Sequence, residues 1–362
     1  MSVIKVLVID DSSVIRNIIK DALSLAPNIE VVGEAEDPII ARELIKTLNP
    51  DILTLDVEMP KMDGITFLEN LMRLRPMPVI MLSTLTTKGA DITLQALELG
   101  AIDFIAKPSV QELLAKKDSF KEVLIDKITH AVKVDQKNYK LSSHLSKKVN
   151  DNVLKFKGAK RTNHIIAIGA STGGTEAIKK ILQTLPENTP PIVIAQHIPK
   201  SFSASFAKRL NELSQMQVHE ASHGQKIKQG NVYIAPGDMH LEVVNKNGSL
   251  FSVLVDTPEV NRHKPAVEVL FDSLLNMASN TQAVLLTGMG QDGAQAMLRL
   301  KEQGARTIVQ DRHTSLIWGM PGKAHDIDAH CLALPLHNIG KSLLTYASLG
   351  RDRTREETNE SK

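Results

Sequence analysis

Ser171 stands in the short sequence GASTGG (169–174), between an apolar run and a helix-like stretch. This arrangement satisfies the pattern G-x-S-x-G, a sharp turn that exposes a serine hydroxyl where a strand leads into a helix. Free N–H groups at the start of that helix would favour an anion developing beside the hydroxyl. The same residues also suit a glycine-rich loop that cradles a phosphate or a nucleotide. The motif alone therefore leaves a catalytic nucleophile and an anion-binding loop open.

A reactive serine needs a base, and His197 is the candidate among the twelve histidines. It ends the apolar run 191–197, the next predicted strand after the one that leads to Ser171. Parallel strands joined by one helix are usually close neighbours, so both side chains are expected at the same edge of the sheet. A structural role is expected for histidines in polar or loop contexts, which include His219, His223, His240 and His263.

Asp292 is the candidate for the group that orients the imidazole and stabilises its positive form. It follows a predicted strand and precedes a helix in LLTGMGQDGAQA (285–296). Asp238 and then Asp311 are the alternatives, and capping of the helix that follows would explain Asp292 without catalysis. The chain order serine, histidine, aspartate differs from the order serine, acid, histidine of the α/β-hydrolases, so an ordinary lipase-like enzyme is not indicated.

Three aspartates end predicted strands in the first third of the chain. Asp10 and Asp11 follow the apolar run that begins at Val6, and Asp56 ends a second run at 51–57. In an open sheet with strand order 2-1-3-4-5, ligands bind beyond the carboxyl ends of the strands, where these three carboxylates would converge. A hard divalent cation relieves their mutual repulsion, and oxygen ligands suit Mg²⁺.

Two further strand ends add a hydroxyl and an ammonium group to this acidic site. Ser83 ends the run 78–83, and Lys107 ends the run 103–107. With a metal and a lysine to balance the phosphoryl oxygens, the site is suited to accept a phosphoryl group on Asp56. Helix capping and surface charge would explain an acidic pair alone, but they do not explain polar groups at four strand ends.

The elements that position these groups alternate between apolar runs and stretches of helical period. The runs are almost continuously apolar, which is typical of strands buried on both faces. This alternation predicts a doubly wound parallel sheet of the flavodoxin-like type. The predicted strands are 6–10, 30–35, 51–57, 78–83 and 103–107, and the predicted helices are 13–25, 38–48, 64–74 and 88–99.

The second half of the chain repeats this pattern and indicates another α/β domain, a Rossmann-like parallel sheet. Two alternating runs around Asn247-Gly248 predict an antiparallel hairpin within 240–256. Cys331, in the apolar run AHCLALP, and Trp318 are expected to pack in the core. The predicted strands of this half are 164–171, 191–197, 231–236, 283–288 and 307–311.

Composition excludes several classes of protein. The 362 residues carry a formal net charge of +2, with 42% hydrophobic and 23% charged residues, which is typical of a globular chain of two or three domains. No apolar run is long enough for a membrane-spanning helix, and the N-terminal segment does not resemble a signal peptide. The single cysteine excludes an internal disulfide and fits a reducing cytoplasm. Near-neutral charge and 3% aromatic residues argue against a dedicated nucleic-acid binder.

The N-terminal sequence resembles a response-regulator receiver domain through the motifs VIDDSS, LDVEMPKMDG, MLST and DFIAKP. The resemblance implies that Asp56 accepts phosphate from a histidine kinase. It also implies that Asp11, Asp56 and the backbone carbonyl of Glu58 hold Mg²⁺. Ser83 and Phe104 match the positions of the switch hydroxyl and the switch aromatic residue.

The second half resembles the catalytic domain of chemotaxis protein-glutamate methylesterases through IGASTGGTEA, AQHIP, YIAPGDMH, NRHKPAVEVLF and TGMGQDGA. The resemblance implies Ser171 as nucleophile, His197 as base and Asp292 as orienting acid, with Thr172 and Met289 shaping the triad and the oxyanion site. It implies hydrolysis of glutamate methyl esters on methyl-accepting chemotaxis receptors and deamidation of glutamine at the same sites. No cofactor is implied for this chemistry, and a chemotaxis histidine kinase is the implied phosphodonor.

These observations predict a receiver domain at 1–122, a basic linker at 123–160, a methylesterase domain at 161–349 and a disordered charged tail at 350–362. The linker is interpreted as a solvated spacer, with a docking surface for an acidic partner as the alternative. We expect a cytoplasmic protein whose receiver limits access to the serine until Asp56 is phosphorylated.

Two other classes of function remain as alternatives. A regulator that binds a nucleotide through GASTGG would need an acidic residue about 20 positions further on for the ribose, where Pro191 and Ile192 stand instead. A receiver-linked DNA-binding regulator would need a basic recognition helix, whereas the basic excess lies in the linker.

Overall fold

In the computed structural model the chain forms two compact units, Met1–Val149 and Asn150–Lys362. The predicted tail at 350–362 and much of the predicted linker lie outside the described residues. Within the described part, no helix combines the length and apolar character needed to cross a membrane. The structure describes residues 3–84, 86–107, 110–134, 153–158 and 164–349.

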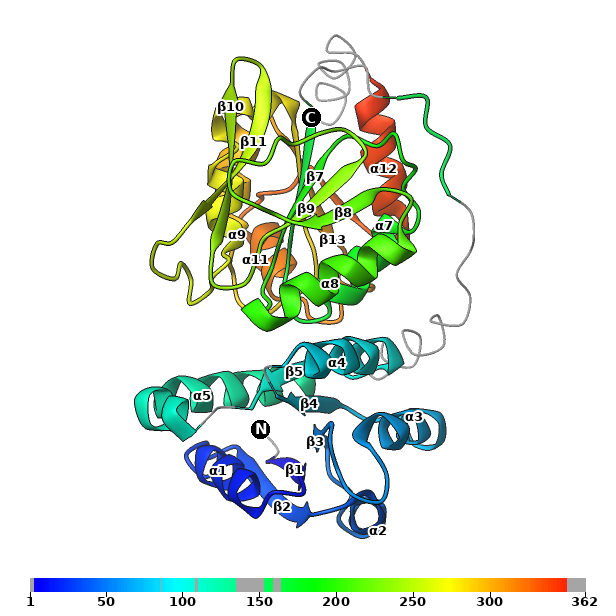
Figure 1. The fold of residues 1–362 in the computed structure, drawn as a ribbon, viewed down its shortest axis with the longest axis vertical. Helices are drawn as coiled ribbons and strands as arrows, with labels where there is room; N and C mark the ends of the chain where they lie inside the picture. The colour runs from blue at the N-terminus through cyan, green and yellow to red at the C-terminus, as the bar shows by residue number, and fades with distance from the viewer. Residues whose placement is uncertain (1–2, 85, 108–109, 135–152, 159–163, 350–362) are drawn as a thin grey trace. The chain divides into compact units, whose positions relative to one another are not determined.

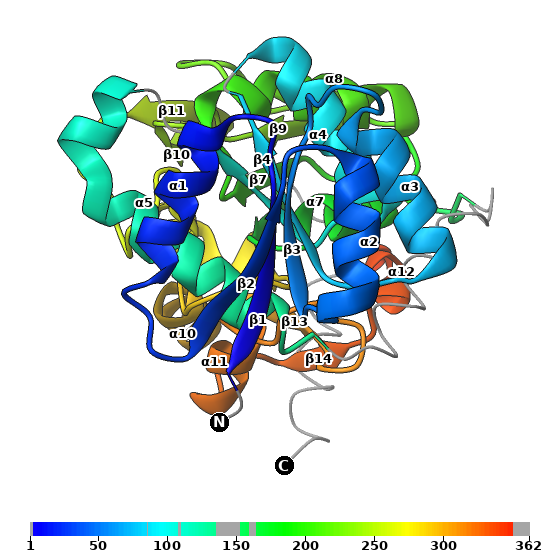
Figure 2. The same cartoon turned by 90° about the horizontal axis from the view of Figure 1, so that it is seen from below.

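The first unit is a five-stranded parallel sheet in the order β2-β1-β3-β4-β5, which confirms the predicted strand order (Figure 1). Helices α1 and α5 lie on one face of the sheet, and α2, α3 and α4 lie on the other (Figure 2). The strands are β1 (Ile4–Ile9), β2 (Ile29–Ala35), β3 (Ile52–Asp56), β4 (Val79–Ser83) and β5 (Asp103–Ala106). The helices are α1 (Ser13–Leu23), α2 (Pro38–Leu48), α3 (Gly64–Leu74), α4 (Thr87–Leu99) and α5 (Val110–Ala131).

Helix α5 continues to Ala131, inside the segment that the composition predicts as a linker. Its last turns bury Leu124, Ile128 and Ala131, whose spacing places them on one face of the helix. Helix α5 packs against α1 within the first unit. Burial of an apolar stripe therefore keeps these residues helical despite the high local content of lysine.

The second unit is a seven-stranded parallel sheet in the order β14-β13-β12-β6-β7-β9-β8, with a separate antiparallel pair, β10 and β11. The pair turns at Asn247-Gly248, as the sequence predicts, and β14 lies in the strand-like run AHCLALP, whereas the short strand β8 was not predicted. The strands are β6 (Ile165–Ala170), β7 (Ile192–Gln196), β8 (Gln217–Glu220), β9 (Asn231–Ile234), β10 (His240–Lys246), β11 (Ser249–Val255), β12 (Thr281–Leu285), β13 (Arg306–Gln310) and β14 (Leu332–Leu334).

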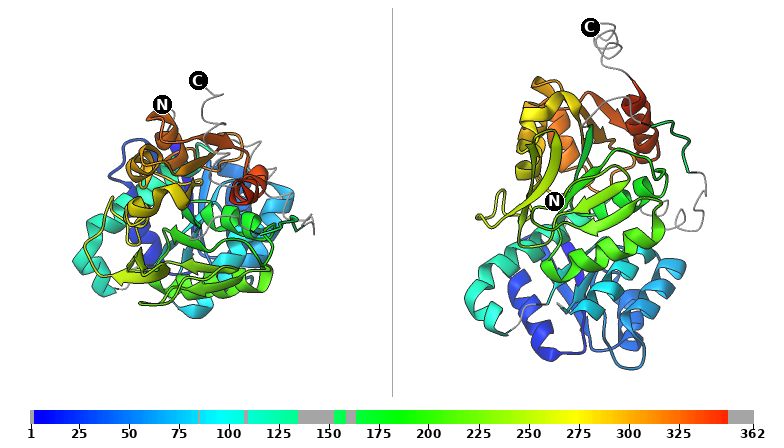
Figure 3. Two further views of the ribbon diagram at one scale, coloured as in Figure 1. Left: turned by 90° about the horizontal axis from the view of Figure 1, so that it is seen from above. Right: turned by 45° about the horizontal axis from the view of Figure 1, so that its top comes forward.

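Helices cover both faces of this sheet. Helices α7, α8 and α12 pack on one face, and α9, α10 and α11 pack on the other, with the β10–β11 hairpin against α9 (Figure 3). The helices are α7 (Gly174–Leu182), α8 (Lys200–Leu213), α9 (Val267–Asp272), α10 (Ala294–Glu302), α11 (Met320–Asp326) and α12 (Leu336–Ser348), with a 3₁₀ helix at Leu275–Asn280.

The strand order reverses at β6, which lies between β7 and β12. Register pairs Ala170 of β6 with Gln196 of β7, and Gly169 with Leu285 of β12. The carboxyl ends of these three strands therefore meet at one edge. In open parallel sheets, such a reversal point is where a crevice forms for a ligand.

The prediction for Cys331 is wrong, because this cysteine is exposed. It precedes β14, a three-residue strand at the edge of the sheet that is itself only partly buried. A strand at the edge of a sheet has a neighbouring strand on one side only. Its residues can therefore stay exposed even when the run is apolar. Trp318 is partly buried and packs against the core of the second unit, as expected.

Candidate functional site

Ser171 lies in a turn that is held by main-chain hydrogen bonds on both of its peptide groups. Its N–H donates to the carbonyl of Thr287 at 3.1 Å, and its carbonyl accepts from the N–H of Gly174 at 2.7 Å. A side chain at Gly288 would place its Cβ 2.7 Å from the Cβ of Ser171. The loop after β12 therefore passes directly against the serine because residue 288 has no side chain.

His197 directly follows β7, the strand next to β6, at the same edge of the sheet. Its backbone N–H donates to the carbonyl of Ala170 at 3.1 Å, and the side chain of Gln196 donates to the carbonyl of Ser171 at 3.0 Å. The prediction that β6 and β7 are neighbours is confirmed by their parallel pairing. The serine and the histidine therefore follow two adjacent strands at the same edge of the sheet.

Asp292 contacts the imidazole directly, with its Oδ2 2.8 Å from Nε2 of His197. Both side chains are almost fully buried. The other donors to this carboxylate are the backbone N–H of Val267 at 2.6 Å, the side-chain amide of Asn261 at 2.9 Å and the backbone N–H of Glu268 at 3.2 Å. Burial raises the pKa of Asp292, but the bonds from His197 and these donors outweigh burial and hold the pKa below its usual value.

The remaining ring nitrogen of His197, Nδ1, is buried and has no hydrogen-bond partner among the described residues. No hydrogen bond joins it to Ser171 within that part of the chain. Catalytic hydrogen bonds are often long in a free enzyme and tighten when substrate binds. Because Asp292 engages Nε2, Nδ1 is the nitrogen whose lone pair is left to accept a proton.

Asn261 and His263 also belong to this site, although the sequence reasoning did not select either. The His263 ring stacks on the His197 ring, with centroids 3.5 Å apart and planes at 16°. Both residues lie in the loop between β11 and α9, and buried His240 anchors that loop through Nδ1, which accepts the N–H of Ala266 at 3.1 Å. A loop has no periodic pattern that marks which residues point inward. The polar segment NRHKP (261–265) was therefore the only signal in the sequence for Asn261 and His263.

Asp292 caps a helix, but not the helix that follows it in sequence. The carboxylate accepts from Val267 and Glu268 at the start of α9. Helix α10, which follows Asp292, begins after Gly293 with no side-chain cap. Capping therefore contributes to holding the carboxylate, and it leaves Oδ2 in contact with His197.

The rival aspartates occupy other environments. Asp311 closes its own turn by accepting from the N–H of Thr314 at 2.8 Å and from its hydroxyl at 2.6 Å. Asp238 lies in a left-handed turn with φ of 63°, and its N–H donates to the carbonyl of Lys264. The geometry therefore favours Asp292 as the partner of His197.

Two residues were predicted to shape the oxyanion site. Thr172 is buried, and its carbonyl accepts from the hydroxyl of Thr287 at 3.0 Å. The backbone N–H of Met289 has no acceptor in the part of the chain that the structure describes. The N–H of Ser171 is already bonded to Thr287, and the role of the Met289 N–H as an oxyanion donor stays a prediction.

The acidic residues of the first unit converge as the strand order predicts. Ligand oxygens of Asp10, Asp11 and Asp56 all lie within 4.8 Å of one another. Nζ of Lys107 lies 2.8 Å from Oδ2 of Asp10 and 2.8 Å from Oδ1 of Asp56. The ends of β1, β3 and β5 therefore form one site from residues nearly 100 positions apart.

This cluster carries more negative charge than its single lysine balances. Burial raises the pKa of Asp56 to about 6, against the opposing charge of Lys107 and with a further contribution from Asp10. Three convergent carboxylates with only oxygen ligands fit a hard divalent cation such as Mg²⁺. The residues present therefore suit the metal that the sequence predicts.

The other predicted residues of this site occupy distinct positions. The backbone N–H of Glu58 bonds to the carboxylate of Asp56. Ser83 is buried, and its hydroxyl donates to the carbonyl of Gly89 at 3.2 Å rather than to Asp56. Phe104 is also buried. The metal contact from the Glu58 carbonyl and the switch roles of Ser83 and Phe104 stay predictions.

The raised pKa of Asp56 predicts how the stability of the first unit depends on pH. Because the folded pKa lies above the ordinary value of 3.8, folding favours the protonated carboxyl. In a buffer with chelator, we expect the free energy of unfolding to fall as the pH rises from about 4 to about 6, by at most about 3 kcal/mol. Thermal unfolding of the full chain, compared with Asp56→Asn, isolates this contribution.

The variant has no charge to gain at residue 56, so it is expected to lack this fall. Mg²⁺ added at neutral pH should stabilise the wild type more than the variant, because the cation binds the ionised carboxylate. Equal pH profiles for the two proteins would contradict the raised pKa.

Two family descriptions match the chain in succession. Residues 6–117 match the response regulator receiver domain, and residues 166–343 match the CheB methylesterase. A protein-glutamate methylesterase/protein-glutamine glutaminase of Saccharophagus degradans is 49% identical over 349 residues, covering 96% of this chain and 99% of that protein. A protein of the same name from Hydrogenovibrio crunogenus is 48% identical over 372 residues, covering 95% and 99%.

A solved structure supports the fold of the second unit. The CheB methylesterase catalytic domain of Thermotoga maritima is 38% identical, with a TM-score of 0.50, and the match covers 51% of this chain and all of that domain. A parallel sheet with a receiver match and a second parallel sheet with a methylesterase match define a response regulator whose output domain is a hydrolase.

The chain belongs to the protein-glutamate methylesterase/protein-glutamine glutaminase family. This finding confirms the predicted family and the predicted class of enzyme. The two parallel-sheet domains confirm the predicted fold class.

Proposed function

We propose that this protein is a phosphorylation-regulated serine hydrolase that demethylates glutamate methyl esters on chemotaxis receptors and deamidates glutamine at the same sites. The contact of 2.8 Å between His197 and Asp292, at the sheet edge that carries Ser171, is the observation on which this proposal rests. The names of the relatives, which combine methylesterase and glutaminase, support both reactions. The alternative of a nucleotide-binding loop at GASTGG does not account for a buried histidine–aspartate pair beside it.

Acyl transfer to Ser171 forms the first half of the proposed reaction. The serine Oγ attacks the ester carbonyl while its proton passes to Nδ1 of His197, the nitrogen opposite Asp292. The N–H of Met289 donates to the oxyanion, and such a donor contributes about 2.7–4 kcal/mol to the transition state. The intermediate collapses, the C–O bond to the methoxy group breaks, and methanol leaves with the proton from His197.

Hydrolysis of the glutamyl-enzyme forms the second half. A water molecule gives a proton to His197 and attacks the acyl carbon, and His197 then returns this proton to Ser171. The products are a glutamate side chain of the receptor with a free carboxylate group and the original serine. With glutamine as substrate, ammonia replaces methanol as the leaving group in the same sequence of steps.

Phosphorylation of Asp56 forms the regulatory part of the proposal. Mg²⁺ held by Asp11, Asp56 and the Glu58 carbonyl, with Asp10 beside it, would neutralise charge on the phosphoryl oxygens. The phosphoryl group carries about two negative charges, toward which Lys107 and Ser83 would shift. We expect this change to reach Phe104 and to release an inhibitory contact that limits access to Ser171.

The predicted partners and limits of the domains form part of the same proposal. The substrate is a methyl-accepting chemotaxis receptor, the phosphodonor is a chemotaxis histidine kinase, and neither nucleic acid binding nor membrane insertion is expected. We retain the cytoplasmic location and the domain limits 1–122, 123–160 and 161–349.

Methanol release from methylated receptor membranes tests the proposed function and its regulation together. A small-molecule phosphodonor should raise the rate for the wild type and leave Asp56→Asn at its unstimulated rate. A fragment of residues 155–349 should exceed the unphosphorylated full chain. A fragment slower than the full chain would contradict autoinhibition, and absence of methanol release from every form would contradict the esterase itself.

A fluorophosphonate probe separates the hydrolase from the nucleotide-binding alternative, because it labels an activated serine and not a phosphate-binding loop. We expect labelling at residue 171. Nucleotide binding without labelling would favour the alternative.

A further inference from the structure

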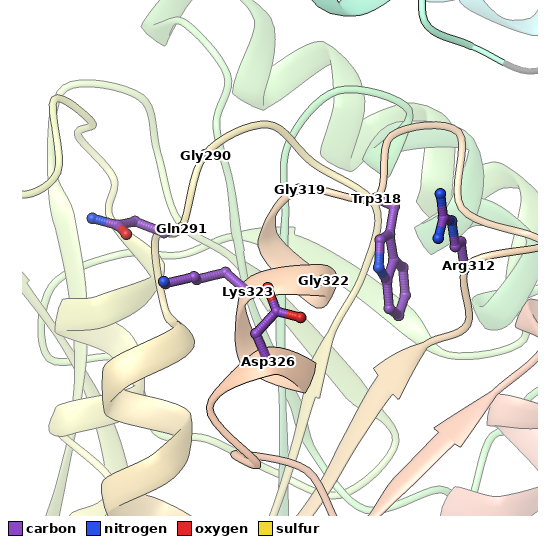
Figure 4. Close-up of a pocket in the computed structure, with 8 residues that line it drawn as sticks. All are labelled: Gly290, Gln291, Arg312, Trp318, Gly319, Gly322, Lys323 and Asp326. Carbon is purple, nitrogen blue, oxygen red and sulfur yellow. The ribbon is translucent and has the colours of Figure 1, made fainter.

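A cavity of about 510 Å³ opens beside the loop that carries Met289 (Figure 4). Three glycines contribute to its lining: Gly290 after β12, Gly319 before α11 and Gly322 within α11. Positions without side chains leave room for a ligand to approach the backbone. A volume of this size accommodates several side chains of a polypeptide.

This cavity is joined to the nucleophile through one residue, Gly288. The Gly288 carbonyl accepts the N–H of Met320 at 2.9 Å, at the start of the helix that lines the cavity. On its other side, Gly288 abuts Ser171 closely enough that an added Cβ would lie 2.7 Å from the serine Cβ. The loop after β12 therefore runs from the neighbour of Ser171 to Gly290 and Gln291 in the lining of this cavity.

Trp318 provides an apolar wall for the cavity. The indole packs against the core of the second unit, and these contacts fix its orientation. A Cβ at Gly322 would lie 2.8 Å from both Cδ1 and Nε1 of the indole. The absence of a side chain at residue 322 thus lets the indole lie against α11, where its exposed part can pack on the methylene groups of a ligand.

Two cations line the same cavity from different elements. Arg312 follows β13, Lys323 lies on α11, and both side chains are exposed. Among the described residues, neither makes an ion pair. Asp326 is the single carboxylate in the lining, so the cavity has an excess of one positive charge.

We propose that this cavity binds acidic side chains of the substrate polypeptide that flank the ester attacked by Ser171. The inference rests on the proposed function and adds a preference for sequence around the ester. A guanidinium group binds a carboxylate through two parallel hydrogen bonds, and an ammonium group adds a point charge. The apolar wall of Trp318 contacts the methylene groups of the same acidic side chain.

Trp318 is the only tryptophan in the chain, so its fluorescence reports on this cavity directly. Two peptides serve as probes, each with one glutamine at the reactive position and with either aspartate or asparagine on both sides. In full-length Ser171→Ala treated with a phosphodonor, we expect the aspartate peptide to change the fluorescence at lower concentration than the asparagine peptide. Each exposed cation contributes up to roughly a fivefold difference in affinity.

Charge reversal assigns this preference to the cavity. Arg312→Glu and Lys323→Glu should each weaken binding of the aspartate peptide, and together they should remove or reverse the preference. Lys246→Glu, at the exposed end of β10, makes the same change in net charge away from the lining and is expected to keep the preference. Equal affinities for the two peptides in the parent protein, or an equal loss in the control, would overturn the proposal.

Kinetics with the matching methyl ester peptides provide a second readout. In enzyme with Ser171 intact, charge reversal should raise KM for the aspartate peptide and leave kcat unchanged, because the ester itself does not contact these cations. Hydrolysis of a small neutral ester should be unaffected. If no peptide or small ester is hydrolysed, the proposed function fails, whereas the fluorescence titration still decides whether the cavity selects acidic peptides.

Discussion

Replacing Ser171 with alanine is expected to abolish methanol release from glutamate methyl esters, with a loss in kcat on the order of 10⁶-fold. The alanine removes the only atom that attacks the ester in the proposed reaction. The backbone of this turn is held by Thr287 and Gly174 through main-chain bonds that the substitution does not touch. The variant should therefore fold and unfold like the wild type.

Methanol release and fluorophosphonate labelling, measured together with thermal unfolding, check this expectation. Ser249→Ala, on strand β11 of the hairpin, removes a hydroxyl group outside the proposed site and should retain full activity. Turnover near the wild-type rate in a folded Ser171→Ala variant would refute the assignment of the nucleophile.

Asp292→Asn is expected to lower kcat by about 10⁴-fold, because the amide favours the wrong tautomer of the imidazole. Each carboxylate oxygen of Asp292 accepts from two donors, His197 and Val267 on Oδ2 and Asn261 and Glu268 on Oδ1. An asparagine must point its NH₂ group at one of these pairs. Each pair includes a backbone N–H that cannot become an acceptor, so neither orientation of the amide restores the original bonds.

The pH profile of kcat and the thermal stability of this variant distinguish a loss of imidazole orientation from a loss of folding. We expect some loss of thermal stability, because a buried donor is left facing a donor, together with a much larger loss of kcat. Asp311→Asn is the matched control, since Asp311 bonds to Thr314 through Oδ1 and an asparagine can keep that carbonyl acceptor. Activity of Asp292→Asn within tenfold of the wild type would exclude Asp292 as the orienting acid.

Most of the strands, and the functional residues at their ends, could be predicted from the local sequence pattern. Runs such as VLVI before Asp10 and IIAIGA before Ser171 have almost no polar residues because both faces of each strand are buried. Buried parallel strands end where polar residues begin, so Asp10, Asp56, Ser171 and His197 could be assigned to sheet edges from local pattern. The order of the first sheet then brought its carboxylates together as predicted.

The tertiary structure alone decided which loop residues reach these edges. Asn261 and His263 contact Asp292 and His197 from a loop with no periodic pattern, and the capping role of Asp292 belongs to a helix that precedes it in sequence. Arg312 and Lys323 line one cavity although they lie on separate elements. Such contacts join residues by packing across long sequence distances, whereas the spacing of residue types carries information only about neighbours along the chain.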